Sequence, residues 1–470
     1  MLAGCPVLGW AASGGMALTG QADGAPVASP APAFGLLCAV VEELAAVTGA
    51  TGVEVRADPG ELVAGRAALS GLRRRGRVSA GGSARLVRAA DGWCAVNLSR
   101  EDDVAAVPAI IGALGLADDV DGVAGPGAWA AAGADGVWGA LEAAARGTRA
   151  EVLAETAQLL GVPAGALPSP RPGAGQPTAR PVAGLGGSGQ GGGWPPGRVG
   201  RIAAPSAGAR LAGAVVVDLS SMWAGPLCAR LLGLAGADVI KVESASRPDG
   251  GRAGERRFFD CLQTGHRSVL LDFRAVAGRR TLAALLAAAD VVIEASRPRA
   301  LAQLGLAPEM IPHRDGQVWL SITGYGRGDR ALAERVAFGD DAAAAGGLVG
   351  WDGGVWGVGE PVFCADAIAD PLTGVCGALA VARSVAGGGG QLIDLAMRDV
   401  AADFAAAPAV DHGAHSVRTV GGDAVVTCAA LGLEQVVLPP RPPAAAGVAA
   451  AMGADTADVL AWLSAGSSGC

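Results

Sequence analysis

The chain has 470 residues, more than one hydrophobic core usually holds, so we expect at least two domains. Its formal net charge of −8 gives no electrostatic reason to expect nucleic acid as a partner, because polyanion-binding proteins carry basic faces. The uncharged run at residues 24–41 is interrupted by Pro26, Pro30 and Pro32 and is a poor spanning helix, so no membrane partner is expected.

The cysteines and the N-terminus bear on compartment and metal content. The nine cysteines are odd in number and never spaced as C-x-x-C, which favours scattered reduced thiols over a disulfide framework or a zinc site. The first residues, MLAGCPVLGW, lack the basic start and clean apolar core of a secretory signal. We therefore predict a cytoplasmic protein without a metal site.

Residues 1–169 form the first predicted region. A helical stretch, GLLCAVVEELAAVTG, is followed by two strands joined at Asp91-Gly92, and then by further helices. No strand–helix–strand unit of a parallel sheet is recognisable in this region. The pattern predicts a smaller α+β domain.

Residues 170–205 form a predicted linker. The stretch 170–201 is rich in glycine and proline, contains no acidic residue and has almost no bulky aliphatic side chain. Such a segment buries too little apolar surface to order itself.

Residues 206–405 alternate between short apolar runs and helical spacing. Strands are predicted at 214–220, 238–243, 267–273, 290–296 and 317–326, with helices at 225–236, 277–289 and 371–385. The alternation indicates an α/β fold with a Rossmann-like, doubly wound parallel sheet and right-handed crossovers. Residues 406–470 lose this pattern and are predicted to be a C-terminal tail with a short final helix.

Several linked motifs cover about residues 211–403: VVVDLSSMWAGPLCARLLGLAGADVIKVE, GHRSVLLDFRAVAGRRTLAALLAAADVVIEASRP, SITGYGRG and ADPLTGVCGALAVAR. In order and spacing they resemble the class III CoA-transferases, the family of formyl-CoA transferase, carnitine CoA-transferase and α-methylacyl-CoA racemase. The stretches RLVRAADGWCAVNL and GVPAGALP resemble the family's small domain, which here precedes the Rossmann-like region. We therefore hypothesise that residues 1–169 supply the small domain. The resemblance also implies a CoA thioester as substrate, no permanently bound cofactor and a homodimer.

Asp370 is the predicted catalytic residue. From the residues alone, Asp370-Pro371 is typical of an ordinary helix start, because Asp is a good N-cap and Pro suits the first turn. The resemblance implies a nucleophilic aspartate at this position, and the following Thr373-Gly374 match the family pattern. The two interpretations are compatible, since a helix N-terminus stabilises an ionised carboxylate. A weak internal similarity places Ala31-Pro32 on Asp370-Pro371 and Gly35 on Gly374.

The resemblance also implies a set of residues that contact CoA. The loop after the first predicted strand, SSMWAGP, matches a family loop whose backbone surrounds CoA, although a plain tight turn is the alternative. Basic residues of the family bind the CoA phosphates, and the loose candidates here are Arg247, Arg252, Arg256 and Arg257. The predicted CoA contacts are Ser221, Met222, Trp223, Ala224, His266, Arg267 and Arg297.

One departure from the family pattern bears on the reaction. The racemase branch needs a histidine beside an aspartate, but the matching stretch reads RVAFGDDAAAAGG and has no histidine. Asp340 and Asp341 are either active-site acids or, in the simpler interpretation, a polar helix start. The sequence thus predicts a CoA-transferase that moves CoA from an acyl-CoA to a carboxylic acid through an aspartyl anhydride. A catalytically silent acyl-CoA-binding protein is the alternative, and a racemase is disfavoured.

Overall fold

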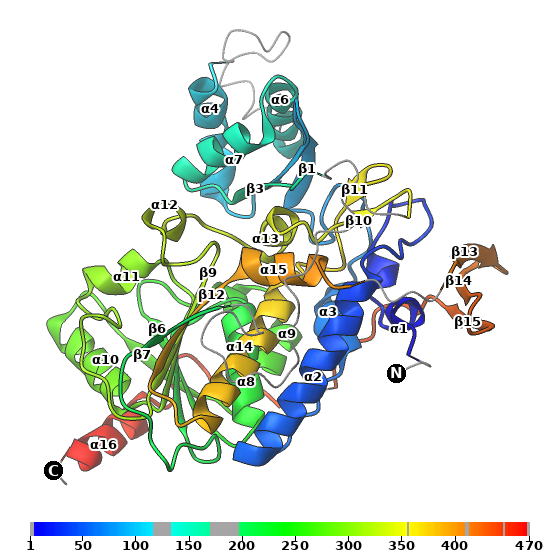
Figure 1. Ribbon diagram of the computed structural model, residues 1–470. Helices are drawn as coiled ribbons and strands as arrows, with labels where there is room; N and C mark the ends of the chain where they lie inside the picture. Colours follow the sequence, from blue (N-terminus) through cyan, green and yellow to red (C-terminus); the bar gives the residue numbers. More distant parts are fainter. Residues whose placement is uncertain are drawn as a thin grey trace.

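The structure is a computed structural model that describes residues 4–115, 133–169, 197–354, 357–408, 413–444 and 447–467. Its centre is a seven-stranded sheet in the order β4-β12-β9-β8-β5-β6-β7 (Figure 1). These strands are β4 (Arg198–Arg201), β5 (Val215–Asp218), β6 (Asp238–Ser244), β7 (Arg267–Leu271), β8 (Val291–Glu294), β9 (Val318–Thr323) and β12 (Gln391–Ala396). All neighbours are parallel except β4 with β12. The strand order reverses between β5 and β8, so the predicted doubly wound α/β sheet is confirmed, with its switch point there.

Helices cover both faces of this sheet (Figure 1). On one face α8 (Ala224–Leu234) and α14 (Ala369–Ala386) pack together, and α2 (Ala31–Thr51) packs along α14. On the other face lie α10 (Val276–Ala288), α11 (Pro298–Gln303) and α16 (Thr456–Ser467), with Leu282, Leu285 and Val459 in the shared core. Short β-branched runs such as Val215 to Val217 form the buried strands because their stiff side chains suit a pleated sheet covered on both sides.

Residues 84–115 and 133–166 form a separate small α+β unit at the top of Figure 1. Its antiparallel sheet is β1 (Ala84–Arg88), β2 (Trp93–Asn97) and β3 (Ala164–Ala166). The helices α4 (Glu101–Ala113), α6 (Gly133–Arg146) and α7 (Ala150–Leu159) complete a core of its own. The hairpin turn falls at Asp91-Gly92, as the sequence predicts, and β1 faces a second core shared with Trp351 and Phe363.

The remaining N-terminal elements pack on the second region rather than forming an independent unit. They are α1 (Pro6–Ala12), η1 (Met16–Leu18) and α3 (Pro59–Ser70), and together with α2 they share one continuous core with the sheet helices α8 and α14. By length and composition α2 is apolar enough to cross a membrane. Here its apolar residues, among them Leu37 and Leu44, are buried in that core.

Further short elements connect these parts. They are η2 (Gly250–Ala253), α9 (Arg256–Gln263), α12 (Arg330–Ala333), α13 (Gly339–Ala345), β10 (Gly350–Trp351), β11 (Pro361–Val362) and α15 (Met397–Ala405). The helix α13 lies between the small unit and the N-terminus of α14 (Figure 1).

Two segments differ from the sequence expectation. Residues 170–196 of the predicted linker lie outside the described residues, but residues 198–201 form the edge strand β4, which pairs with β12 through its backbone. The predicted tail contains a three-stranded antiparallel sheet of β13 (His415–Val420), β14 (Asp423–Cys428) and β15 (Leu433–Val436) before the expected helix α16. Both were missed because exposed strands carry too few apolar side chains to show a strong pattern.

Candidate active site

Asp370 lies in the first turn of α14, at the end of that helix nearest the carboxyl ends of the parallel strands. Its neighbours in the chain, residues 361–369 and 371–379, are all buried, whereas Asp370 itself is partly exposed. The first turns of α14 and α8 approach closely because Gly374 has no side chain. A Cβ at that position would lie 2.7 Å from the carbonyl oxygen of Ala224. Asp370 therefore stands beside the loop that precedes α8.

An arginine from the N-terminal region belongs to the surroundings of Asp370. Arg66 of α3 forms a two-pronged ion pair with Asp366, with Nε 2.9 Å from Oδ2. Asp366 is fully buried, and the Arg66 guanidinium also lies over the Trp223 ring, 4.9 Å from its centroid. A buried carboxylate requires such a partner, since an unpaired buried charge is very costly.

The segment before α14 is held in a strained conformation. Ala365 and Ala367 have φ values of 52° and 43°, in the left-handed region that residues with a Cβ rarely adopt. The N–H of Ala365 donates to Thr19 Oγ1 at 2.9 Å, and the N–H of Ala367 donates to Asp340 Oδ1 at 3.1 Å. These two bonds fix the loop that carries Asp366 and leads into Asp370.

Three carboxylates, those of Asp340, Asp366 and Asp370, thus surround one guanidinium. Burial raises the pKa of Asp370 to about 7; Arg66 lowers it, and Asp340 and Asp366 raise it further. Burial, together with Asp366, likewise raises the pKa of Asp340 to about 7, against the lowering effect of Arg66. The Gly339 N–H donates to the Asp370 carboxylate and opposes the rise. The cluster therefore holds a carboxyl group that ionises near neutral pH rather than in acid.

The loop Ser221–Ala224 follows β5 at the switch point. Met222 has a φ of 72°, and its N–H donates to Asp249 Oδ1 at 2.9 Å. Lys241 is 2 % exposed and pairs with Asp249 at 2.9 Å, and it also donates to the Ser220 carbonyl. Lys241 is therefore a buried support for the loop.

The four loop residues face different ways. Ser221 and Met222 are exposed, whereas Trp223 and Ala224 are buried. The Trp223 ring packs edge-on against Phe258, with ring centroids 5.0 Å apart, and beneath Arg66. The loop and the Asp370 cluster are thus linked through Trp223 and Arg66.

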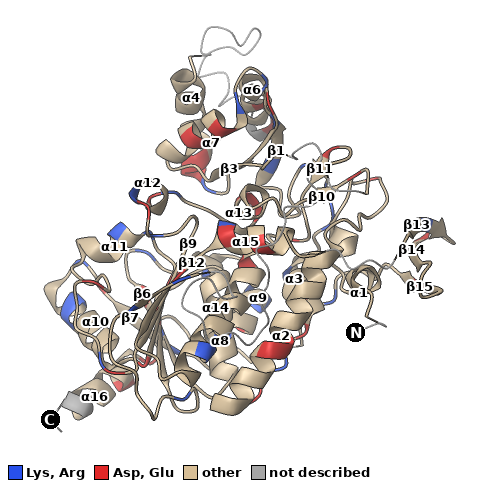
Figure 2. Cartoon of the chain, viewed as in Figure 1, with Lys and Arg blue, Asp and Glu red and all other residues tan. Residues whose placement is uncertain are grey.

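Arg297 is the N-cap residue of α11 and follows β8, the strand next to β5. Burial lowers its pKa, as do the neighbouring cations Arg299, Arg247 and Arg100, while Glu334 opposes the change. Arg247 follows β6, so cationic groups gather beyond the carboxyl ends of β6 and β8, the strands on either side of β5. Figure 2 shows basic positions on α11 and α12 at this side of the sheet. Such an electropositive edge suits a phosphorylated ligand.

The structure does not bring His266 and Arg267 to this site. Arg267 begins β7 and pairs with Asp238, the first residue of β6, so both lie at the amino end of the parallel strands. His266 is buried, with Nδ1 3.1 Å from Gln263 Oε1, and burial lowers its pKa to about 4. Both residues stay predictions as CoA contacts, whereas Trp223, Ala224 and Asp370 do lie together.

The small unit also reaches the helix beside Asp370. Asn97 Nδ2 donates to Asp341 Oδ1 at 3.2 Å, and the same oxygen accepts the N–H of Phe338 at 3.0 Å. Asp341 therefore caps α13 as the simpler interpretation expects, while the adjacent Asp340 faces the cluster around Asp370. Sequence reasoning missed Arg66 and Asp366, and no local pattern marks an ion pair between residues 300 positions apart.

A cavity of about 450 Å³ lies elsewhere, between α1, α2 and α3. Phe34, Val41, Asp58 and Arg441 are among its lining residues, and Asp370 is not. Its size alone therefore does not connect it with the cluster around Asp370.

Comparison with known proteins places the second region in a family. Residues 211–432 match the sequence model of CoA-transferase family III. This match supports the class III CoA-transferase family for this part of the chain. The match confirms the resemblance drawn from the sequence motifs, and it includes Asp370, the loop Ser221–Ala224 and the strands that carry them.

Individual relatives share only part of their length with this chain. An acyl-CoA transferase of Fusarium pseudograminearum is 31% identical over 140 residues, which are 26% of this chain and 31% of the relative. The beta subunit of succinyl-CoA–L-malate CoA-transferase of Chloroflexus aurantiacus is 34% identical over 204 residues, 40% of this chain and 49% of the relative. A CAIB/BAIF family protein from Brucella suis of known structure is 30% identical, covers 42% of this chain and 55% of its own, and has a TM-score of 0.35. The chain thus spans about half or less of the length of the curated relatives.

Proposed function

We propose that the protein is a CoA-transferase that moves CoA from an acyl-CoA thioester to a carboxylic acid, with Asp370 as the nucleophile. The observation that carries the proposal is a carboxyl group at a helix N-terminus, partly exposed within buried surroundings and with a pKa raised by burial to about 7. A carboxylate of that basicity is a better nucleophile than an ordinary aspartate and is still ionised in part at neutral pH.

The first step forms a mixed anhydride. An Asp370 carboxylate oxygen attacks the thioester carbonyl, the carbon–sulfur bond breaks, and CoA leaves as its thiolate. Negative charge develops on the carbonyl oxygen during the attack, and the positive end of the α14 helix dipole can stabilise it. The buried surroundings exclude water, which would hydrolyse the anhydride.

The second step transfers CoA to the acceptor. The acceptor carboxylate attacks the Asp370 carbonyl carbon, the first acid leaves, and a new mixed anhydride forms. CoA thiolate then attacks the acceptor's acyl carbon and releases the Asp370 carboxylate. One thioester is consumed and one is made, so the exchange is nearly balanced in energy and requires no ATP.

The electropositive edge beyond the strands is the proposed binding site for the CoA phosphates. Arg247 and Arg297 follow β6 and β8, and the exposed backbone at Ser221-Met222 lies between them in the strand order. CoA phosphates at this edge would let the pantetheine arm run along the loop toward Asp370. A homodimer, a cytoplasmic location, the absence of a permanently bound cofactor and the partial internal copy also remain part of this proposal.

The N-terminal region contributes contacts to the proposed active site. Arg66 pairs with Asp366, and Asn97 bonds Asp341 on the helix that carries Asp340. Both contacts support the hypothesis that residues 1–169 supply a part of the enzyme that the second region lacks.

The test is chemical trapping of the anhydride. The protein is incubated with a panel of acyl-CoAs and then with hydroxylamine, which converts an activated aspartyl carbonyl to a hydroxamate. Peptide mass spectrometry should find the hydroxamate at Asp370 and only in the presence of an acyl-CoA. Asp329→Asn is the matched control, because Asp329 also stands at a helix start but in the short helix α12.

The alternative, a silent acyl-CoA-binding protein, gives the opposite result. It predicts acyl-CoA binding with no hydroxamate at any residue and no change in Asp370→Ala. A racemase would exchange the α-proton of an acyl-CoA, but among the described residues no histidine lies in the cluster: His266 is under α8, His313 bonds Gln317, and His415 begins β13.

A further inference from the structure

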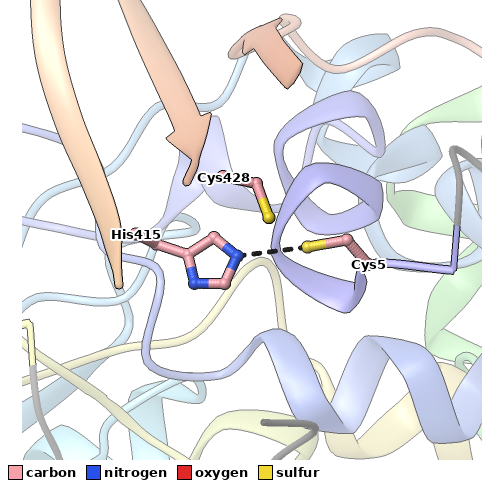
Figure 3. Close-up of side chains that lie close together, drawn as sticks. All are labelled: Cys5, His415 and Cys428. Carbon is pink, nitrogen blue, oxygen red and sulfur yellow. Dashed lines mark hydrogen bonds between the residues drawn. The ribbon is translucent and has the colours of Figure 1, made fainter. Parts of the chain in front are cut away.

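Three metal-ligating side chains from opposite ends of the chain meet beside α1. They are Cys5, His415 and Cys428, and their ligand atoms all lie within 4.8 Å of one another. Cys5 Sγ is 3.2 Å from His415 Nε2. In Figure 3 the imidazole and both sulfur atoms point into the same space. Among the residues that the structure describes, this is the group with metal-binding geometry.

The backbone fixes two of these ligands relative to each other. His415 begins β13 and Cys428 ends β14, and the two are directly opposite partners in the antiparallel register. Side chains of opposite partners project to the same face of the sheet. Cys5 is the N-cap residue of α1, the helix on which this sheet packs.

We infer that Cys5, His415 and Cys428 form a zinc site of the Cys₂His type, with solvent in the fourth position. Zinc bonds of about 2.3 Å to sulfur and about 2.0 Å to nitrogen put tetrahedral ligand atoms roughly 3.5–3.8 Å apart. The observed separations need only small adjustments to reach that geometry. Cys5 and Cys428 are buried and His415 is partly exposed, so solvent can reach the open position. Two soft thiols with an imidazole favour zinc over calcium or magnesium.

The surroundings give such a site a structural role. The sheet β13–β14–β15 stands out beside α1 at the right of Figure 1. Its outer strands are largely exposed, and Val426 and Cys428 are its fully buried side chains. A small sheet with so little core is only marginally stable alone. A metal ion would join it to α1, adding to the backbone bond from Leu438 N–H to the Ala11 carbonyl, 2.9 Å long. Binding would release the thiol protons to solvent.

Sequence spacing could not have revealed this site. Cys5 and His415 are 410 positions apart, and no C-x-x-C pair precedes them. The cysteines are scattered along the sequence, but the fold brings two of them together with a histidine.

The experiment measures metal on the intact chain. Protein purified with reductant and stripped by chelator is given one equivalent of Zn²⁺, desalted and analysed by mass spectrometry for metals. We expect about one zinc per chain, and Co²⁺ in its place should show thiolate-to-cobalt charge transfer and tetrahedral d–d absorption. Zinc should also raise the unfolding temperature.

Variants locate the ion. Cys5→Ser, Cys428→Ser and His415→Ala should each weaken zinc binding by at least the roughly 10- to 100-fold that loss of an outer-shell partner costs. Cys261→Ser, in α9, should bind as the parent does. The wild-type cobalt spectrum keeps the test decisive if a variant fails to fold. Zinc lost on desalting, an oxygen-ligand cobalt spectrum, unchanged binding in the three variants, or a Cys5–Cys428 disulfide that zinc does not prevent would each overturn the inference.

Discussion

The helices α2 and α14 lie side by side and begin with similar sequences, Ala31-Pro32 and Asp370-Pro371 (Figure 1). Their N-termini have opposite surroundings. Ala31 is fully buried, and the start of α2 faces Leu348 and Phe404. Asp370 is partly exposed and faces Arg66, Asp340 and Asp366.

The two helix starts differ in their surroundings more than in their backbone. Both helices carry a proline in the first turn, and the N–H groups of Ala31 and Asp370 each donate to a carbonyl three residues earlier. At α14 the charged neighbours, the partial exposure and the adjacent loop turn a capping position into a carboxyl with a pKa near 7. At α2 the same position only fills space in the core.

Single substitutions at the two helix starts should have the largest effects. Asp370→Ala removes the proposed nucleophile, and we expect transferase activity to fall by at least about 10³-fold while acyl-CoA binding persists. Ala31→Asp puts an unpaired carboxylate into the core and should destabilise the protein by about 3 kcal/mol or more, without producing a trapped adduct at residue 31. Steady-state kinetics and thermal unfolding measure the two outcomes. Full activity in Asp370→Ala would contradict the claim that the start of α14, unlike that of α2, carries the nucleophile.

Loss of the arginine should come next. Arg66→Gln removes a cation that lowers the pKa of Asp370, so that pKa should rise further and less of the carboxyl should be ionised at pH 7. We expect activity at pH 7 to fall about 10- to 100-fold, with partial recovery at higher pH. Arg56→Gln, at an exposed arginine paired with Glu54, is the control and should be silent. An unshifted pH profile in Arg66→Gln would show that Arg66 only supports the fold.

Activity and stability should depend on pH in opposite directions. Asp370 must be ionised to attack, so the rate should rise with pH and approach a plateau above about 7. The same raised pKa means that the folded state holds the proton longer than the unfolded one. The contribution of Asp370 to the stability of the folded state is therefore complete below about pH 4 and is lost as the pH rises through about 7.

Asp370→Asn isolates this contribution to stability. The variant should lack the part of the pH dependence of the unfolding temperature that Asp370 supplies, and be more stable than the wild type by a few degrees at pH 8. A wild-type rate that is already maximal at pH 5 would contradict the raised pKa.

The smallest effect should come from the two glycines that the internal similarity aligns. A Cβ at Gly374 would lie 2.7 Å from the Ala224 carbonyl oxygen, whereas one at Gly35 would lie 3.3 Å from Pro6 side-chain atoms. Gly374→Ala should push the loop before α8 outward, costing about 1–3 kcal/mol of stability and several-fold in the Michaelis constant for acyl-CoA. Gly35→Ala should change stability by less than about 1 kcal/mol and leave the kinetics unchanged. Equal effects from both substitutions would refute the close approach at α14.

The sequence predicted the elements that bury continuous apolar runs. The strands Val215–Asp218 and Val291–Glu294 and the helix Ala224–Leu234 were foreseen because local spacing determines which face they bury. The sheet 415–436 was missed, because its outer strands are largely exposed and carry no strong apolar pattern.

The sequence predicted only those parts of the candidate site whose residues lie within one short segment. Asp370 and the loop Ser221–Ala224 stand out through motifs within short segments. Arg66, Asp366 and Asp340 come together through tertiary packing over a separation of 300 residues, which one sequence does not encode in any readable period. The motif alone suggests His266 as a CoA contact, but in the fold this residue is buried against α8.

The central claim is that Asp370 exchanges an oxygen atom with the acceptor. The direct measurement uses an acyl-CoA with an acceptor whose carboxylate is labelled with ¹⁸O, followed by mass spectrometry of the Asp370 peptide after turnover. In the proposed anhydride exchange an acceptor oxygen remains on the aspartate, so Asp370 should gain about 2 Da for each label incorporated. Product formation without label at Asp370, or with label at Asp340 or Asp366 instead, would contradict it.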